Sequence, residues 1–193
     1  MVMASVGRRA TWAFMLAFGI AGCSGVGGID SSLVSPISND DTFATIGYLW
    51  GGVRSAISSK REPDVGPFSL ALSFKLPCTR GGQGSYQGTL TGTKTATGGS
   101  GTLSITASLA ACQFDDRSVI TTISASGVTA IGTIAIVNDT WGDINIHMVA
   151  PSVTVNGVAC PGGVDVQLTG TTPSAPPTST GTSCGRTGAV ALP

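Results

Sequence analysis

Alternation of apolar and polar residues with a period of two is the feature that most constrains this chain. Between Phe68 and Leu76 every second residue is a large apolar one, and the residues between them are Ser, Ala, Ser and Lys. The stretch from Leu103 to Leu109 has the same pattern. Because successive side chains of a β-strand point to opposite faces, this alternation predicts strands with one buried face and one face in water.

Shorter and less regular runs of the same kind follow at residues 118–125, 132–137, 143–149 and 164–168. Between two of the runs lies Asn156-Gly157, the dipeptide favoured in type I′ hairpin turns. Paired glycines separate others, at 81–82, 98–99 and 162–163. Short strands with such turns predict an all-β domain, either an antiparallel sandwich or a partly closed barrel.

A pattern of cysteine and glycine occurs twice in this part of the chain. Cys78 is followed by Gly-Gly, by a predicted strand containing Leu-Thr-Gly-Thr, and then by Cys112. Cys160 is followed by the same features in the same order, ending at Cys184. We interpret the two segments as copies of one duplicated β unit.

The first 22 residues have the composition of an export signal. Arg8 and Arg9 give a positive start, and residues 10–21 are uncharged and mostly apolar. This run fits the apolar core of a signal peptide and is shorter than the roughly 20 residues that a membrane-spanning helix needs. The sequence therefore predicts that residues 1–22 are a signal peptide.

The apolar run ends in Ile20-Ala21-Gly22-Cys23, which resembles the lipobox of bacterial lipoproteins. The resemblance implies cleavage after Gly22 and attachment of diacylglycerol to Cys23, often with a further acyl chain on the new amino terminus. Two or three acyl chains hold a protein to a membrane far more firmly than one. Ser24 follows the cysteine, as in lipoproteins that enteric-type bacteria send to the outer membrane. The resemblance therefore implies a lipid-anchored protein of the cell envelope, and its motif covers the leader alone.

Residues 23–39 are rich in Gly and Ser, and they predict a flexible tether between the lipid and the domain. Residues 40–62 are the one predicted helix. Its apolar residues recur at spacings of three and four, which places them on one helix face: Phe43, Ile46, Trp50, Val53 and Ile57.

Both ends of this predicted helix have suitable residues. Asp40, Asp41 and Thr42 offer N-cap groups, and Pro63 ends the run. Gly47, Gly51 and Gly52 oppose the assignment, because each costs about 1 kcal/mol relative to alanine inside a helix. They either permit close packing or break the helix in two.

Residues 63–193 form the predicted β domain. It contains four of the five cysteines, all except Cys23. An even number of cysteines in an exported chain favours disulfides over metal ligation. Of the three connectivities we favour Cys78–Cys112 with Cys160–Cys184, because each bridge closes one copy of the duplicated unit. Prolines in the loop at residues 172–183 argue against regular structure there. A zinc site lacks any Cys-x-x-Cys pair and has one histidine, so we predict no metal and no cofactor.

Two motifs with catalytic potential have simpler explanations. Ser183 lies in a Gly-x-Ser-x-Gly string, but no histidine follows it and no helix is predicted after it, so we interpret the match as chance. His147 lies on the polar side of a predicted strand with Asp143. We interpret it as a solvated or hydrogen-bonded strand residue rather than a general base.

The best candidate for ligand contact is residues 138–143, which bring Asp139, Trp141 and Asp143 together on a predicted turn. The segment lacks the ligand spacing of an EF-hand loop, and weak contact with calcium or a sugar is the chemistry it offers. Trp141 or Tyr86, exposed near the β loops, would provide an aromatic platform for a carbohydrate.

Charge excludes one class of partner. Charged residues make up 10% of the chain, against roughly 25% in typical soluble domains. Without Arg8 and Arg9, 8 basic residues face 10 acidic ones, a formal charge of −2. The lysines and arginines are scattered singly, so the chain has no basic stripe for the phosphates of a nucleic acid.

These observations predict a non-enzymatic lipoprotein of the bacterial envelope with a structural or interaction role. Its expected partners are the membrane, through the lipid, and an envelope protein or glycan. The first alternative is a carbohydrate- or small-ligand-binding surface module. A hydrolase is the second and less favoured alternative.

Overall fold

The structure is a computed structural model that describes residues 37–61, 63–116, 119–171 and 177–192. In this part of the chain one helix precedes ten strands, which we name in chain order: α1 (Asn39–Ser58), β1 (Gly66–Leu76), β2 (Gly81–Thr95), β3 (Gly98–Asp116), β4 (Val119–Val137), β5 (Thr140–Ala150), β6 (Ser152–Val155), β7 (Val158–Ala159), β8 (Val164–Thr171), β9 (Thr178–Ser183) and β10 (Arg186–Ala191).

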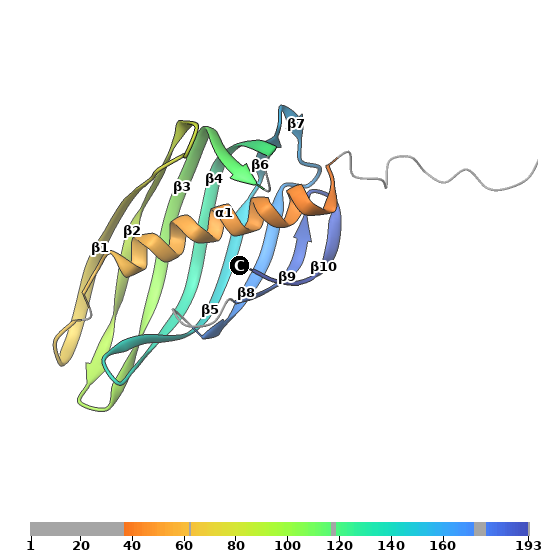
Figure 1. The fold of residues 1–193 in the computed structure, drawn as a ribbon. Coiled ribbons are helices and arrows are strands. Elements are labelled where there is room, and N and C mark those ends of the chain that lie inside the picture. Colours follow the sequence, from red (N-terminus) through yellow and green to blue (C-terminus); the bar gives the residue numbers. More distant parts are fainter. Residues whose placement is uncertain (1–36, 62, 117–118, 172–176, 193) are drawn as a thin grey trace, which may run out of the picture. The chain divides into compact units, whose positions relative to one another are not determined.

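The strands pair antiparallel in one sheet, in the order β1-β2-β3-β4-β5-β8-β9-β10, and the sheet does not close on itself. β4 pairs with two strands in turn: its first part pairs with β6 and its second part with β5. Both pairings have the same register, so β6 continues the line of β5 along β4. The predicted all-β class, antiparallel and preceded by one helix, is confirmed. The second layer of the domain is α1, which crosses one face of the sheet (Figure 1).

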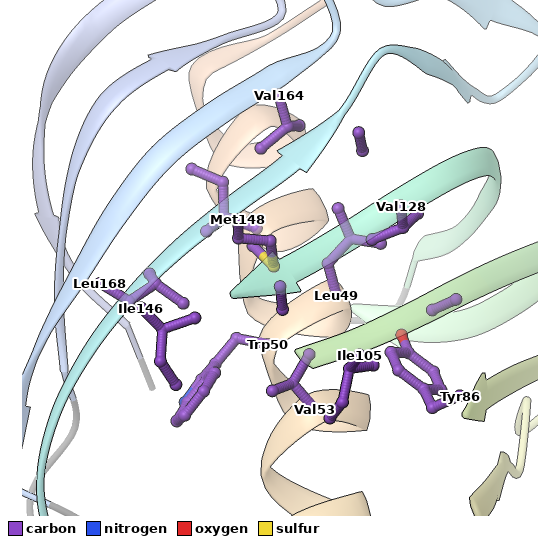
Figure 2. Close-up of a cluster of buried hydrophobic side chains, with 14 of the residues drawn as sticks. Leu49, Trp50, Val53, Tyr86, Ile105, Val128, Ile146, Met148, Val164 and Leu168 are labelled. Atoms are coloured by element: carbon purple, nitrogen blue, oxygen red, sulfur yellow. The ribbon is translucent and has the colours of Figure 1, made fainter. Parts of the chain in front are cut away.

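The core lies between α1 and the sheet face that it covers, which we call the inner face. Leu49, Trp50 and Val53 point from the helix toward the sheet (Figure 2). The strands supply buried residues at alternate positions, among them Tyr86, Ile105, Val128, Ile146, Met148 and Leu168. The period of two in the sequence therefore arises because every second strand residue faces the helix.

The helix begins one residue earlier than predicted and is not broken by its glycines. Its N-cap is Ser38, whose hydroxyl accepts a hydrogen bond from the backbone N–H of Asp41 at 3.1 Å. The predicted cap groups Asp40, Asp41 and Thr42 all lie inside the helix instead. The helix ends at Ser58 rather than at residue 62.

The predicted buried face of the helix is correct at every residue but one. Ile46, Trp50, Val53 and Ile57 are buried, whereas Phe43 is 39% exposed. Leu49 and Ala56 are fully buried in addition. The buried face is therefore wider than the stripe that was predicted, and at the start of the helix it is rotated away from Phe43.

Both predicted disulfides are confirmed: Cys78 bonds to Cys112, and Cys160 bonds to Cys184. In each case the first cysteine precedes a strand that pairs with the next strand in the chain. The second cysteine lies where this pairing ends: Cys112 is inside β3, and Cys184 directly follows β9. Each bridge therefore closes a hairpin. The strand registers place both bridges at the same end of the sheet.

Two predicted boundaries need correction. The tether does not extend to residue 39, because Ile37 is buried in the core and its carbonyl accepts hydrogen bonds from Arg186 at 2.8 and 3.3 Å. The predicted loop at residues 172–183 includes β9, which pairs with β8 along Thr178–Ser183. Its prolines stand before the strand and leave the strand's own N–H groups free to pair. Cys23, the lipobox and residues 23–36 of the predicted tether lie outside the described residues.

Candidate interaction surface

Trp141 is not on an exposed turn, as the sequence had indicated, but is 6% exposed on the inner face of β5. The turn is shorter than predicted: Asn138 and Asp139 both have positive φ and form it alone, and β5 begins at Thr140. A register shift between Ile134 and Ile136 then turns Trp141 inward. The prediction that Trp141 lies exposed on a turn is therefore wrong.

The two carboxylates predicted beside Trp141 are both exposed, whereas Trp141 itself is buried. Asp139 at the turn forms an ion pair with Lys94, at 2.7 Å between Nζ and Oδ1. The same Nζ donates to the carbonyl of Pro63 at 3.0 Å, so this lysine connects β2, the β4–β5 turn and the segment after α1. Asp143 is exposed on β5, where it pairs in register with Thr171 of β8. The buried Trp141 and these exposed carboxylates therefore do not form the exposed turn site that the sequence predicted.

His147 is an exposed strand residue, and its charged neighbour is on the next strand. Its Nε2 lies 2.7 Å from Oδ1 of Asp165 on β8, and both side chains are more than half exposed. The interpretation of His147 as a hydrogen-bonded strand residue agrees with this geometry.

Tyr86 is fully buried on the inner face of β2, so its prediction as an exposed platform is also wrong. Its hydroxyl has no hydrogen-bond partner among the described residues. Burial raises the pKa of the phenol well above its usual value, because the charged phenolate would lose its hydration. Tyr86 is therefore a core residue.

Ser183 lies at the end of β9, beside the two-residue turn Cys184-Gly185 that joins β9 to β10. It is 3% exposed, and its hydroxyl contacts the Cys184 sulfur at 3.9 Å. A nucleophile elbow needs a turn between a strand and a helix. The turn here joins two strands, which agrees with the chance interpretation.

The sheet face opposite α1, which we call the outer face, carries many neutral polar side chains among a few charged and apolar ones. The strand registers align one row of exposed residues across seven strands, from β1 to β9: Ser69, Thr91, Thr102, Thr133, Asn145, Thr169 and Thr178. Neighbouring strands lie roughly 4.8 Å apart, so the row is a ladder of hydroxyl and amide groups. Sequence reasoning found the polar alternation but not this alignment, because register depends on which strands pair.

Part of the outer face is organised by side-chain hydrogen bonds between β5 and β8. Gln167 donates to Asn145 at 2.5 Å, close to the His147–Asp165 pair. These bonds fix the orientation of polar groups that are otherwise free to rotate. The outer face can therefore present donors and acceptors to a partner in a defined arrangement.

A small cavity lies between the first turns of α1 and strands β8 to β10. Its volume is about 190 Å³, and its lining includes Phe43 and Ile46 from the helix and Arg186 and Gly188 from β10. A Cβ built at Gly188 would meet no atom within 4 Å. Typical sites for drug-sized ligands have roughly 300–1,000 Å³, so this cavity suits only a small, largely apolar molecule.

Comparison of the chain with protein-family models, with curated proteins and with solved structures finds no match. Within the described ranges, no three His, Cys, Asp or Glu side chains lie close enough to hold a metal ion. The helix that the structure describes is not long and apolar enough to cross a membrane.

Proposed function

We propose that this chain is a lipid-anchored lipoprotein of the bacterial cell envelope, at the outer membrane, whose β domain has a non-enzymatic structural or interaction role. The observation that carries the proposal is the use of the five cysteines. Two disulfides use Cys78, Cys112, Cys160 and Cys184, which suits an oxidising compartment. The fifth is Cys23, which stands in the lipobox-like sequence.

The outer face is the surface that we assign to the partner. α1 covers the inner face, so the ordered ladder of hydroxyl and amide groups on the other side is the large polar surface of the domain. Neutral groups of this kind suit an envelope protein or a glycan as partner, because both offer hydrogen-bonding groups without requiring opposite charge.

Photo-crosslinking in bacterial cells tests this assignment. A photoreactive residue at Thr102 or Thr133 should give adducts with an envelope protein or glycan. The matched control is Val158, which is also exposed but lies on the short β6–β7 hairpin. Adducts that are equally frequent at Val158, or absent from both outer-face positions, would contradict the proposal.

The cavity beside Gly188 favours a second candidate, the binding of a small apolar ligand. A cavity of roughly 150 Å³ lined by apolar side chains can bind benzene. We therefore expect ligand-observed NMR to detect benzene binding and Gly188→Leu to abolish it by filling the open space. Ala189→Leu is the control, because it places the same side chain on the same strand but on the outer face. Equal binding by both variants would eliminate this candidate.

A further inference from the structure

Strand β1 forms one edge of the sheet. It pairs with β2 along all eleven residues of Gly66–Leu76, and its other side has no strand partner in the described part of the chain. The unpaired N–H and C=O groups of such an edge are a template for a further strand. Because eleven residues make a long edge, its sequence decides what can pair there.

The central seven residues of β1 are a palindrome, Phe68-Ser-Leu-Ala71-Leu-Ser-Phe74. An antiparallel strand runs in the opposite direction, so a palindrome is complementary to itself. When two copies pair about a two-fold axis at Ala71, Phe68 lies opposite Phe74, and each serine and each leucine lies opposite another of its kind. Side chains directly opposite in an antiparallel pair share one face, so the inner and outer faces both stay matched.

The side chains of β1 are incompletely covered in the single chain. Leu72 is 3% exposed, but Phe68, Leu70 and Phe74 are only partly buried, although they point to the same inner face. On the outer face, Ala71 and the two flanking serines are exposed and small. A second copy of β1 would cover the aromatic rings on one face and meet no bulky group on the other.

Residues that usually block edge pairing stand only at the ends of the palindrome. Pro67 precedes it and Lys75 follows it, and no charged residue lies within it. In the two-fold register Pro67 lies opposite Lys75 of the second copy, so the two lysines are at opposite ends of the contact and do not repel each other. The seven residues between them are free of these blocking features.

We infer that β1 pairs antiparallel with β1 of a second copy, about a two-fold axis at Ala71, and that the chain is therefore a dimer with one continuous sheet. This self-pairing uses the same surface on both copies, so it closes at two. Pairing of β1 with the other edge strand, β10, would use two different surfaces and would produce open-ended chains instead. The two arrangements therefore differ in the size of the assembly.

Cysteine crosslinking tests the two-fold register directly. The full chain carries Cys23→Ala in every sample, so that neither a lipid nor a thiol at that position joins two molecules. Cα atoms of directly opposed residues lie roughly 4.5–5.5 Å apart, within the range of a disulfide. Ala71→Cys should therefore form a covalent dimer on mild oxidation, because this residue faces itself across the axis.

Ser69→Cys is the matched control. Two copies of residue 69 would be roughly 13 Å apart along the strand direction, too far for a disulfide. Ser69→Cys alone should stay uncrosslinked, whereas an equal mixture with Ser73→Cys should give a heterodimer. Failure of Ala71→Cys to crosslink, or equal crosslinking by Ser69→Cys alone, would overturn the proposed register.

Sedimentation velocity in a density-matched detergent tests the dimer itself. Ala71→Lys places two like charges opposite each other on the exposed outer face, and we expect it to raise the dimer dissociation constant at least about tenfold. Thr102→Lys adds the same charge to the middle of the sheet, and it should leave the dimer unchanged. Circular dichroism checks that both variants keep the β fold.

Three results would overturn the inference. A chain that is monomeric at every concentration would mean that another segment, or nothing, covers β1. Assemblies that grow beyond two copies would favour pairing of β1 with β10. Equal weakening by Ala71→Lys and Thr102→Lys would mean that the dimer contact is the outer face rather than the β1 edge.

Discussion

Gly52 of α1 and Tyr86 of β2 are in direct contact, with no space between them for one more carbon atom. A Cβ built at Gly52 would lie 2.0 Å from Cζ of the Tyr86 ring, far inside van der Waals contact. The glycine therefore allows the helix to approach the sheet over a large buried aromatic ring. The cost of a glycine within the helix is offset by this close packing.

Gly52→Ala should destabilise the protein for this reason. Overpacking a well-packed core costs about 1–3 kcal/mol, which exceeds the gain in helix propensity of about 1 kcal/mol. Gly51→Ala is the matched control, because a Cβ at the neighbouring residue would meet no atom within 4 Å. It should stabilise by up to about 1 kcal/mol. Denaturant unfolding measures both, and equal effects at the two positions would contradict the proposed contact.

Tyr86→Phe should stabilise the protein by about 1 kcal/mol. The hydroxyl of Tyr86 is buried without a hydrogen-bond partner among the described residues, and its removal ends the cost of stripping that group of water. The ring, which fills the space beside Gly52, remains. A loss of stability in denaturant unfolding would show that the hydroxyl has a bonding partner.

The pKa of Tyr86 also predicts how stability depends on pH. Burial raises the pKa of Tyr86 in the folded chain, whereas in the unfolded chain the phenol ionises near pH 10. Below that pH both states are neutral, and the full stability is present. Above it only the unfolded state releases the proton, so the free energy of unfolding should fall by about 1.4 kcal/mol per pH unit. Unfolding curves recorded from pH 9 to 11 should show this fall, and Tyr86→Phe should reduce it.

Each disulfide should contribute separately to stability. The bridges join residues 34 and 24 positions apart, and on the chain-entropy model each stabilises by about 3–4 kcal/mol. We expect Cys78→Ala with Cys112→Ala, and the equivalent pair at Cys160 and Cys184, to lower the free energy of unfolding by similar amounts. If either pair of substitutions left stability unchanged, that bridge would not constrain the unfolded chain as proposed.

Local patterns predicted the longer strands well because each of them has one buried face and one exposed face. The alternation from Phe68 to Leu76 became β1, and Asn156-Gly157 became a hairpin turn in which both residues have positive φ. The cysteine pairs were predicted from the repeated unit, since both members of each pair belong to one hairpin. These features depend on neighbours in the sequence.

Features that depend on register were not predicted. The register shift between Ile134 and Ile136 directs Trp141 into the core, although the polar residues around it in the sequence predicted a turn. The pairing of His147 with Asp165 and the polar row on the outer face require knowledge of which strands are adjacent. A period of two shows which residues share a face of a strand, but it does not show which strand lies beside it. The polar row on the outer face could therefore be identified only from the structure.

The anchor at Cys23 is the central claim, and the mass of the mature protein tests it most directly. The protein should be purified from bacteria grown with a labelled fatty acid and then measured intact, before and after reduction. We expect a chain that begins at Cys23, carries the label as a diacylglyceryl group with or without a further acyl chain, and gains the mass of four hydrogen atoms on reduction of its two disulfides. Cys23→Ala should abolish the label. A wild-type chain that begins at Met1, without label and with every thiol free, would contradict the account.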